Sequence, residues 1–346
     1  MMEARPSVKR LVTGTRSSNM AVLREIDKRA SGGRACRIPV DPDEVSETGD
    51  GAGMARLLTR DPRSFTPCFC LIHWEDTGMT MAAGAERFNL AAGLAGKRVL
   101  VTAGAGGIGL VIAEHLIHHQ ARVFVCDVSK QAIDGFAKHH PQAGCAVADV
   151  SSEADVDLMF TVLKQELGGL DALVNNAGIA GPTGGVEEID PAEWRRCIDV
   201  GLTGQFLCAR RAVPLLKAAG GGMIVNMSSA AGRHGYAFRT PYASAKFGVI
   251  GFTQSLAKEL GPANIRVNAI LPGIVEGPRM DGVIRERAAQ LEISVEAMEK
   301  RYLERVSLRR MVSPNDVAAM VSFLLSDAGR NISGQSIGVD GNVETL

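Results

Sequence analysis

Tyr242 and Lys246 are four residues apart, and of the residue pairs in this sequence they point most clearly to a chemical reaction. That spacing places both side chains on one face of a helix, one turn apart. A tyrosine near its reference pKa of about 10 is a poor base at neutral pH. A lysine ammonium beside it favours the phenolate, which can then exchange a proton with an alcohol. The spacing also arises by chance on helix surfaces, so a plain surface pair is the alternative.

Ser229 lies thirteen residues before the tyrosine, directly after an apolar run at residues 223–227. In a doubly wound sheet, the carboxyl ends of the strands border the cofactor crevice. A hydroxyl at this place can hold a substrate oxygen beside the tyrosine. Its neighbour Ser228 is expected to point elsewhere. We therefore predict a catalytic group of Ser229, Tyr242 and Lys246.

A glycine-rich stretch, Thr-Ala-Gly-Ala-Gly-Gly-Ile-Gly at residues 102–109, follows one apolar run and opens a helical stretch expected at 110–119. Glycines suit a sharp turn and a close approach of the backbone to a pyrophosphate, and the helix N-terminus adds free N–H groups. A plain tight turn is the alternative. Asp127 follows eighteen residues after the last glycine, and this context favours a dinucleotide site.

Asp127 also bears on the choice of cofactor. A carboxylate there accepts hydrogen bonds from the adenosine ribose hydroxyls and repels a 2′-phosphate. The sequence therefore favours NAD over NADP, although Lys130 nearby keeps NADP open. A helix cap for the following segment is a second role that the same side chain can fill.

The elements that position these residues are apolar runs of strand length, which alternate with amphipathic helical stretches. Nearly continuous apolar character is typical of strands covered on both faces. The alternation predicts an α/β doubly wound (Rossmann) parallel sheet of about seven strands flanked by helices. Ser313, followed by Pro and by Asp316, marks a helix start. The expected strands are 98–102, 122–126, 145–148, 172–175, 223–227, 266–271 and 336–339.

Residues 1–80 differ from the remainder in their sequence pattern, because they mix Arg, Gly, Asp and Pro and show little hydrophobic periodicity. We expect a poorly ordered N-terminal extension without a catalytic part. A small accessory element and upstream sequence outside the working enzyme are alternatives. Residues 81–346 are predicted to form a single catalytic domain.

The composition of the chain limits the kinds of binding partner that we expect. The chain has 38 basic and 38 acidic side chains, which gives no electrostatic case for nucleic acid or an anionic membrane. Seven scattered cysteines favour free thiols in a reducing compartment over disulfides or a metal site. No apolar run is long enough to span a bilayer, and no signal-peptide pattern is present. We expect a cytoplasmic protein with no metal.

Several of these pieces together make residues 95–345 resemble the short-chain dehydrogenase/reductase superfamily in its classical form. They are the glycine loop, Asp149 after the third strand, Asn-Asn-Ala-Gly at 175–178, the Ser229/Tyr242/Lys246 group, Pro272-Gly273 and the tail at 333–341. The resemblance implies that Tyr242 is the acid/base, that Ser229 positions the substrate oxygen and that Lys246 binds the nicotinamide ribose and lowers the tyrosine pKa.

For the cofactor, the resemblance implies that Asp149 contacts adenine, that residues 175–178 line the site and that Pro272 and Gly273 lie against the nicotinamide. The predicted cofactor-binding residues are Thr102, Gly104, Gly107, Ile108, Gly109, Asp127, Asp149, Val150, Asn176, Ala177, Gly178, Tyr242, Lys246, Pro272, Gly273 and Val275.

Two departures from the family's pattern stand out. Ala103 occupies the place of the loop's first glycine, which is tolerable if that position needs no positive φ. Gly201 occupies the place of an Asn that, in the family, completes a catalytic tetrad, kinks a helix and holds a water behind the lysine. Glycine can supply the kink but no side-chain hydrogen bond.

The family's substrate pocket corresponds here to residues 179–184, 230–241 and a helical lid around 276–306. Arginines in the last two stretches fit either a basic pocket for an anionic substrate or an ordinary solvated surface. The leading function is NAD-dependent oxidation of a secondary alcohol. An NADPH-dependent 3-oxoacyl-type reductase and a cofactor-binding protein with little catalysis are the alternatives. By analogy with the family we expect a homotetramer or homodimer, built through the helices after Pro191 and Pro241 and the last strand.

Overall fold

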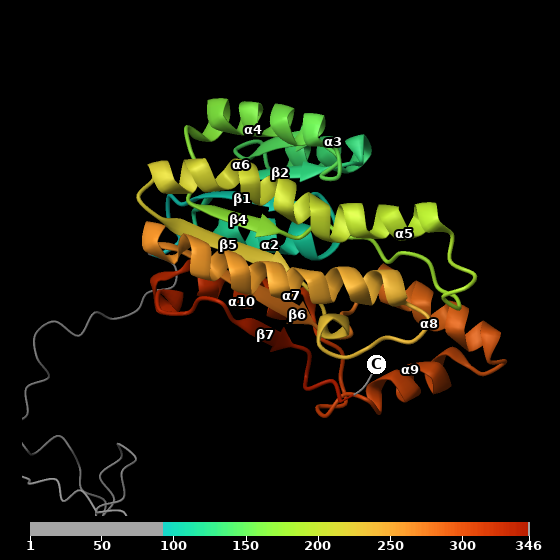
Figure 1. The fold of residues 1–346 in the computed structure, drawn as a ribbon. Coiled ribbons are helices and arrows are strands. Elements are labelled where there is room, and N and C mark those ends of the chain that lie inside the picture. Colours follow the sequence, from blue (N-terminus) through green and yellow to red (C-terminus); the bar gives the residue numbers. More distant parts are fainter. Residues whose placement is uncertain (1–92, 345–346) are drawn as a thin grey trace, which may run out of the picture. The chain divides into compact units, whose positions relative to one another are not determined.

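The structure, a computed structural model, describes residues 93–344. The predicted extension at 1–80 lies outside the described residues. Seven parallel strands form one sheet in the order β3-β2-β1-β4-β5-β6-β7 (Figure 1). They are β1 (Arg98–Thr102), β2 (Arg122–Asp127), β3 (Gly144–Val147), β4 (Ala172–Asn175), β5 (Gly222–Met227), β6 (Ile265–Pro272) and β7 (Ser336–Val339).

The predicted fold class is confirmed, and each apolar run became a strand. The limits of β1, β4 and β7 agree with the expected ranges, and the other four strands differ by a residue at one or both ends. The runs in the five central strands are largely buried because helices cover both faces of the sheet, whereas the edge strands β3 and β7 are partly exposed. In β1, for example, Val99, Leu100 and Val101 are fully buried, with alternate side chains entering opposite cores.

One face of the sheet carries α2 (Gly107–His118), α3 (Lys130–His139) and α10 (Pro314–Leu325), whose apolar side chains share a core. The other face carries α4 (Glu153–Leu167), α6 (Gly204–Ala218) and α7 (Thr240–Leu260), which share a second core. The first helix begins three residues earlier than expected. The start predicted at Ser313 is confirmed, because its hydroxyl and the Asp316 carboxylate form a capping box.

Two further helices, α8 (Pro278–Gln290) and α9 (Val295–Leu303), follow β6 and lie together at one end of the molecule (Figure 1). They fall within the predicted helical lid, whose role over a substrate remains a prediction. Among residues 93–344, no helix is long and apolar enough to cross a membrane.

The strand order reverses between β1 and β4, which are hydrogen-bonded neighbours at the centre of the sheet. At such a point the connections leave in opposite directions and open a crevice at the carboxyl ends of the strands. The glycine loop, Asp127 and Asp149 follow or end the first three strands on this edge. Residues 176–178, Ser229 and Gly273 follow the next three. The fold therefore gathers these six predicted segments on one edge of the sheet.

Candidate active site

Tyr242 and Lys246 lie one turn apart on α7, where Pro241 occupies the first turn of the helix. The Lys246 Nζ atom is 5.7 Å from the centroid of the Tyr242 ring. It donates a hydrogen bond of 2.8 Å to the carbonyl oxygen of Met227, the last residue of β5. An added Cβ on Gly178 would lie 3.3 Å from Nζ, so this glycine leaves room for the ammonium group. A strand end and a helix turn thus hold the lysine beneath the tyrosine.

The lysine is deeply buried, with 4% of its surface exposed. Burial lowers the pKa of Lys246, because the charged form loses its hydration, and the neighbouring Tyr242 acts in the opposite sense. A buried ammonium group with few partners is costly for the fold. Such a cost is common where a charge serves a function.

Ser229 caps the short helix η3 (Ala230–Gly232), and its Oγ accepts a hydrogen bond of 3.2 Å from the Ala231 N–H. This short helix packs against α7, which brings the end of β5 alongside the helix of the tyrosine. Ser228 points the other way, because its hydroxyl is buried and donates to the Lys246 carbonyl at 2.8 Å. The structure therefore separates the two serines as expected.

Four buried polar side chains, Asn175, Gln205, Asn226 and Lys246, form a group that we call the floor of the site. The sequence did not identify them as a group. Gln205 Nε2 donates to the same Met227 carbonyl as the lysine, at 3.2 Å, and Asn175 Nδ2 donates to Asn226 Oδ1 at 2.9 Å. Two acceptors, Asn175 Oδ1 and Gln205 Oε1, are buried without a partner among the described residues. Polar residues inside apolar runs were the available sequence signal.

Gly201 lies in η2 (Asp199–Thr203), a π-helical turn that joins α5 (Pro191–Ile198) to α6. Such a turn kinks a helix and frees backbone groups. Here the Gly201 carbonyl accepts a hydrogen bond from Gln205 Nε2 at 3.2 Å. A π-helical turn therefore stands at the position where the kink was expected. An added Cβ would lie 3.2 Å from the Ala245 Cβ, so glycine also lets this turn approach α7.

The glycine loop after β1 has little room for side chains on its inner side. A Cβ on Gly104 would lie 2.7 Å from Val125 Cγ1, and one on Gly109 would overlap the Ala103 carbonyl and the Asn176 amide. On the outer side, a Cβ on Gly107 would meet nothing, and its φ of +53° favours glycine. The neighbouring Ile108 packs against the core.

Ala103 does need a positive φ, at +49°, so the condition under which its extra methyl is harmless is not met. An L-residue in this region costs roughly 1–2 kcal/mol. The sequence could not reveal this strain, because it depends on how the loop turns back over α2.

Thr102 and Asn176 fasten the loop to the end of β4. The buried Thr102 Oγ1 accepts hydrogen bonds from the N–H groups of Asn176 and Ala177, at 2.9 and 3.0 Å. The Asn176 amide donates to the Thr102 and Ala103 carbonyls, at 3.1 and 3.2 Å. These four bonds join the ends of the two central strands, β1 and β4.

Asp127 ends β2 and is only half-buried. Its Oδ1 accepts a hydrogen bond of 3.0 Å from the Ser129 N–H. The nearby Lys130 is engaged elsewhere, because its Nζ lies 2.8 Å from both carboxylate oxygens of Asp134, one turn along the exposed α3. The two charged residues that bear on the choice of cofactor are therefore not paired with each other.

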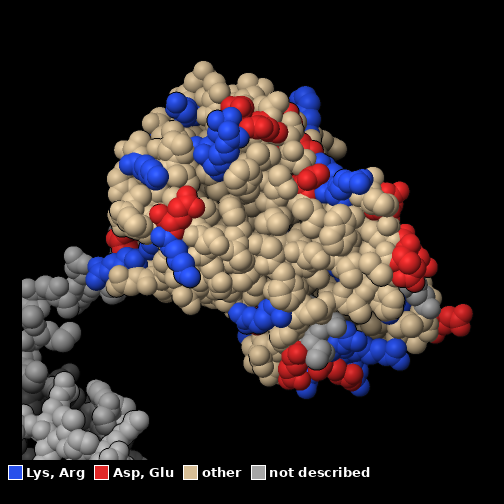
Figure 2. Space-filling view, in the orientation of Figure 1, with Lys and Arg blue, Asp and Glu red and all other residues tan. Residues whose placement is uncertain are grey.

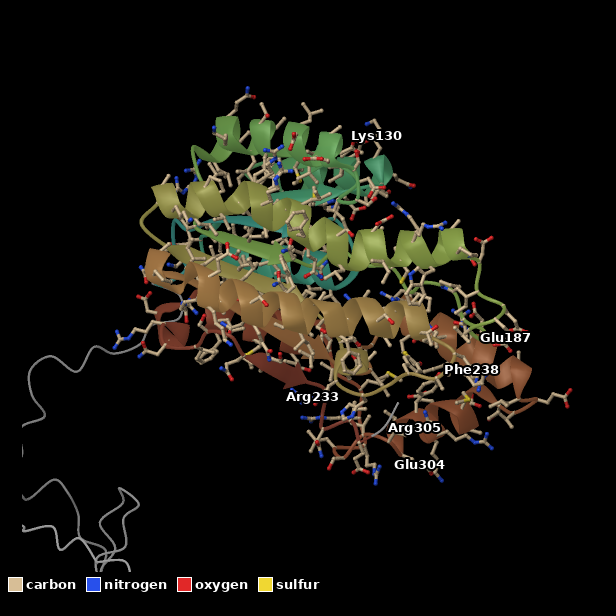
Figure 3. The ribbon with its side chains drawn as sticks, in the orientation of Figure 1. Lys130, Glu187, Arg233, Phe238, Glu304 and Arg305 are labelled. Carbon is tan, nitrogen blue, oxygen red and sulfur yellow. The ribbon has the colours of Figure 1, made fainter. Side chains whose placement is uncertain are left out.

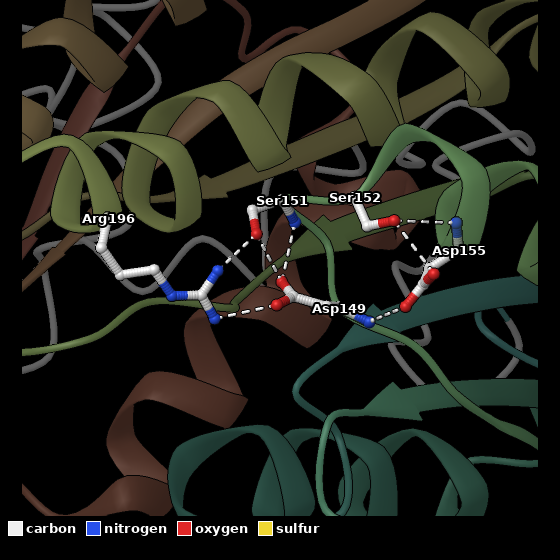
Figure 4. Close-up of polar contacts among 5 residues, drawn as sticks. All are labelled: Asp149, Ser151, Ser152, Asp155 and Arg196. Carbon is white, nitrogen blue, oxygen red and sulfur yellow. Dashed lines mark hydrogen bonds and ion pairs between the residues drawn. The ribbon is translucent and has the colours of Figure 1, made fainter. Parts of the chain in front are cut away.

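Asp149 belongs to a compact polar group after β3, drawn in Figure 4. One carboxylate oxygen accepts from the Ser151 N–H and hydroxyl, at 2.9 and 2.7 Å, and the other pairs with Arg196 at 2.8 Å. Burial acts to raise the pKa of Asp149, but these hydrogen bonds outweigh it and the pKa lies below its usual value. The arginine contact comes from α5, a distant segment that the sequence did not connect with this site. Val150 is buried beside it.

Pro272 ends β6, and the Gly273 N–H donates to the Val339 carbonyl at 3.0 Å. A Cβ on Gly273 would lie 2.7 Å from the Asp340 Cα, so the two strand ends touch here. Val275 pairs with Val312 in an isolated bridge. This pairing leads the chain away from the sheet and into α8.

A separate cavity of about 490 Å³ lies between α8, α9 and residues 309–311. None of the three predicted catalytic residues lines it. Among the described residues, no group of three or more His, Cys, Asp and Glu side chains is arranged to hold a metal ion.

Comparison with known proteins identifies the family of this chain. A family model described as enoyl-(acyl carrier protein) reductase matches residues 103–343. The chain is 37% identical over 246 residues to cis-4-hydroxycyclohexanecarboxylate dehydrogenase of Sinomonas cyclohexanicum, covering 70% of this chain and 94% of that protein. It is 35% identical over 254 residues to the 3-oxoacyl-[acyl-carrier-protein] reductase FabG of Thermotoga maritima, covering 72% of this chain and 98% of that protein.

Solved structures give the same result. Actinorhodin polyketide ketoreductase with NADPH is 32% identical, with a TM-score of 0.69, and covers 72% of this chain and 98% of its own. NAD⁺-bound xylitol dehydrogenase is 28% identical, with a TM-score of 0.68, and covers 72% of this chain and 99% of its own. Between them, these two relatives bind both nicotinamide cofactors. The chain belongs to the short-chain dehydrogenase/reductase family of oxidoreductases, which act on CH–OH groups with a nicotinamide cofactor.

Proposed function

We propose that this protein oxidises a secondary alcohol to a ketone, reversibly, with NAD as the cofactor and Tyr242 as the acid/base. The observation that carries the proposal is the adjacency of Tyr242 to a buried lysine at the strand edge where Ser229 also lies. A surface pair, which is the alternative for a four-residue spacing, does not fit a lysine with 4% of its surface exposed.

The residues on the crevice edge fit a dinucleotide. The inner face of the glycine loop is closed by Val125 and Asn176, while its outer face at Gly106 and Gly107 is open. That open face borders the start of α2, whose free N–H groups and positive dipole end suit a pyrophosphate. Asp127 and Asp149 lie at the next two strand ends, where the adenosine would extend.

When bound, the nicotinamide accepts a hydride from the carbinol carbon or returns it to the carbonyl carbon. The chain's own residues handle the proton and the oxygen. Tyr242 Oη takes the hydroxyl proton in oxidation and returns it in reduction. Ser229 Oγ holds the same oxygen. Lys246 stabilises the phenolate, and its bond to the Met227 carbonyl fixes its position. Gln205 Oε1 is buried and has no hydrogen-bond partner within residues 93–344, so it is suited to hold an internal water behind the lysine.

NAD is favoured over NADP by the charges around the end of β2. Asp127 places a negative charge where a 2′-phosphate would bind, and Lys130 is occupied by Asp134. The alternative is an NADPH-dependent 3-oxoacyl-type reductase, which is motivated by relatives named as ketoacyl reductases. The same catalytic residues would serve it in the reverse direction.

The protein is further proposed to form a homodimer or homotetramer through α5, α7 and the last strand, β7, together with α6, which follows α5 after the π-helical turn. Large apolar side chains are exposed on these helices, namely Trp194, Phe206 and Phe247. Figure 2 shows a broad area over α6 and α7 that carries few charged side chains.

The four described cysteines are free thiols, which supports a reducing compartment such as the cytoplasm.

The test is to follow reduced nicotinamide by absorbance with a panel of secondary alcohols and ketones, supplied with each of the two cofactors. We expect alcohol oxidation with NAD⁺ and a much lower rate with NADP⁺. Faster ketone reduction with NADPH would favour the alternative reductase. Cofactor binding without turnover of any compound would favour a binding protein with little catalysis.

A further inference from the structure

One charged side chain beside the proposed base is not used by the reaction. Arg239 caps the N-terminus of α7, three residues before the tyrosine. Its guanidinium carbon lies 5.4 Å from the centroid of the Tyr242 ring and 5.4 Å from that of Tyr236. Both distances are within the range of a cation–π contact. This arginine is therefore not a freely solvated surface residue.

A backbone contact fixes the arginine further. Its Nη2 donates a hydrogen bond of 2.8 Å to the carbonyl oxygen of Ala180, in the segment that follows β4. The neighbouring Phe238 carbonyl accepts from the Gly184 N–H at 3.0 Å, so two bonds join the loop before α7 to that segment. Both segments were predicted to line the substrate pocket. The guanidinium is held between them.

The same guanidinium is incompletely satisfied. Its Nε is buried and has no hydrogen-bond partner among the described residues. No carboxylate in the described part of the chain pairs with Arg239. A buried donor left without a partner is costly, and an arginine fork is suited to bind a carboxylate through two parallel hydrogen bonds.

Other charges near this place have the same sign. Burial raises the pKa of the Cys197 thiol, while Lys246, Arg239 and Arg279 all act to lower it. Lys246 and Arg279 belong to α7 and α8 and Arg239 lies at the N-terminus of α7, so three cations from these two helices act on this thiol. Phe238, labelled in Figure 3, has 59% of its surface exposed at the same end of the molecule as α8. An anion with an apolar body suits this rim, which we define as Tyr236, Phe238, Arg239 and Arg279.

We propose that Arg239 binds an anionic group of the substrate, a carboxylate, so that the enzyme acts on hydroxy acids and their oxo acids. This inference rests on the proposed alcohol oxidation. The carboxylate oxygens accept hydrogen bonds from Nε and the outward edge of the guanidinium, while Tyr242 and Ser229 hold the carbinol oxygen. Arg279, on α8, contributes charge without a direct contact.

The first test uses hydroxy acids whose carbinol lies one to four carbons from the carboxylate. Each acid is compared with the corresponding neutral carboxamide. We expect kcat/KM of the wild type to favour the acid. Arg239→Gln should reduce the acid-to-amide ratio about 10- to 100-fold, mainly through KM, and Arg239→Lys should restore part of it. Lys138→Gln, which removes an exposed charge from α3, outside the three predicted pocket segments, should leave the ratio unchanged. Equal use of acid and amide by the wild type would overturn the proposal, as would an unchanged ratio in Arg239→Gln.

A second measurement does not need turnover. Calorimetric titration of the NAD⁺-saturated protein with benzoate and with benzamide probes the charge site alone. Benzoate should bind the wild type at least about 10-fold more tightly than Arg239→Gln does, and benzamide should not distinguish the two. If benzoate binds in this way but no alcohol is oxidised, the proposed oxidation fails while the anion site stands. Equal affinity of both proteins for benzoate would refute the anion site, whatever the catalytic result. Thermal unfolding of each variant confirms that it is folded.

Discussion

The floor and the rim of the candidate site are built from opposite kinds of polar group. The floor side chains Asn175, Gln205, Asn226 and Lys246 are almost completely buried and hydrogen-bonded to strand ends or to one another. On the rim, Arg239 is half-buried and Arg279 is exposed, and neither has a carboxylate partner in the described part of the chain.

The difference separates two tasks. Buried groups that bond to the backbone hold their geometry whatever is bound, as is needed to position a proton donor. Groups at the entrance with spare hydrogen-bonding capacity are free to select a ligand by its charge. We therefore expect floor substitutions to change the rate of the chemical step and rim or crevice substitutions to change selectivity.

The largest effect should follow replacement of the floor lysine. Lys246→Met keeps a long side chain that suits burial but removes the charge beside Tyr242. We expect kcat to fall by about 10²- to 10⁴-fold, the range typical of lost acid–base assistance. The free energy of unfolding should rise, because no buried ammonium remains and the Met227 carbonyl keeps its bond from Gln205.

The pH dependence of that stabilisation has a definite sign. Burial lowers the pKa of Lys246 in the folded protein, so the cost of its charge is fully present at pH values below that lowered pKa. As the pH rises from the lowered pKa of the folded protein to the ordinary lysine pKa of the unfolded chain, the cost shrinks and then disappears. Denaturant unfolding at a series of pH values should show the advantage of Lys246→Met shrinking as the pH rises. An advantage that grows with pH would contradict this account.

A smaller effect is expected at the cofactor end of the crevice. Asp127→Ser removes the charge that opposes a 2′-phosphate, and we expect the NAD⁺-to-NADP⁺ ratio of kcat/KM to fall by about 10- to 100-fold. Asp134→Asn is the matched variant, because it removes a carboxylate from α3, the helix that follows Asp127, and releases Lys130. It should move the ratio in the same direction but by less. Equal shifts in both variants would mean that general charge, not the position of Asp127, decides the cofactor.

The effect of the missing amide at Gly201 should be smaller again. Gly201→Asn and Gly201→Ala place the same Cβ against Ala245, so their difference isolates the amide group. We expect kcat to be severalfold higher with Asn than with Ala, because the amide adds a hydrogen bond near the proton path. Steady-state rates of the two variants decide the matter. Equal rates would show that Gln205 and solvent already suffice.

The smallest effect concerns stability alone. Ala103→Gly relieves a positive φ but makes the unfolded chain more flexible, so the two terms partly cancel. We expect a gain of up to about 1 kcal/mol in the free energy of unfolding. Denaturant titration measures it. A loss of stability would mean that the Ala103 backbone is unstrained in solution.

The sequence predicted the sheet well because parallel strands covered by helices on both faces have nearly continuous apolar runs of strand length. It also predicted the separation of Ser228 from Ser229, since neighbouring residues at a strand end point in different directions. The capping box at Ser313 and Asp316 was predictable because it is entirely local.

What the sequence did not reveal depends on distant contacts. The pairing of Arg196 with Asp149 joins two segments almost fifty residues apart, and Gln205 meets the lysine only through the Met227 carbonyl. Arg239 could be placed near Tyr242 by spacing, but its bond to Ala180 and its unpartnered Nε could not. The positive φ of Ala103 likewise follows from the path of the whole loop.

The central claim is that Tyr242 transfers the substrate proton in a nicotinamide-dependent oxidation. Its most direct test is the initial rate of NADH formation by wild type and by Tyr242→Phe, measured with the alcohol of the panel that the wild type oxidises fastest. Phenylalanine keeps the ring that lies between Arg239 and Lys246 and removes only the hydroxyl. We predict normal NADH binding and a rate lower by about 10²- to 10⁴-fold. A rate equal to that of the wild type would contradict the account.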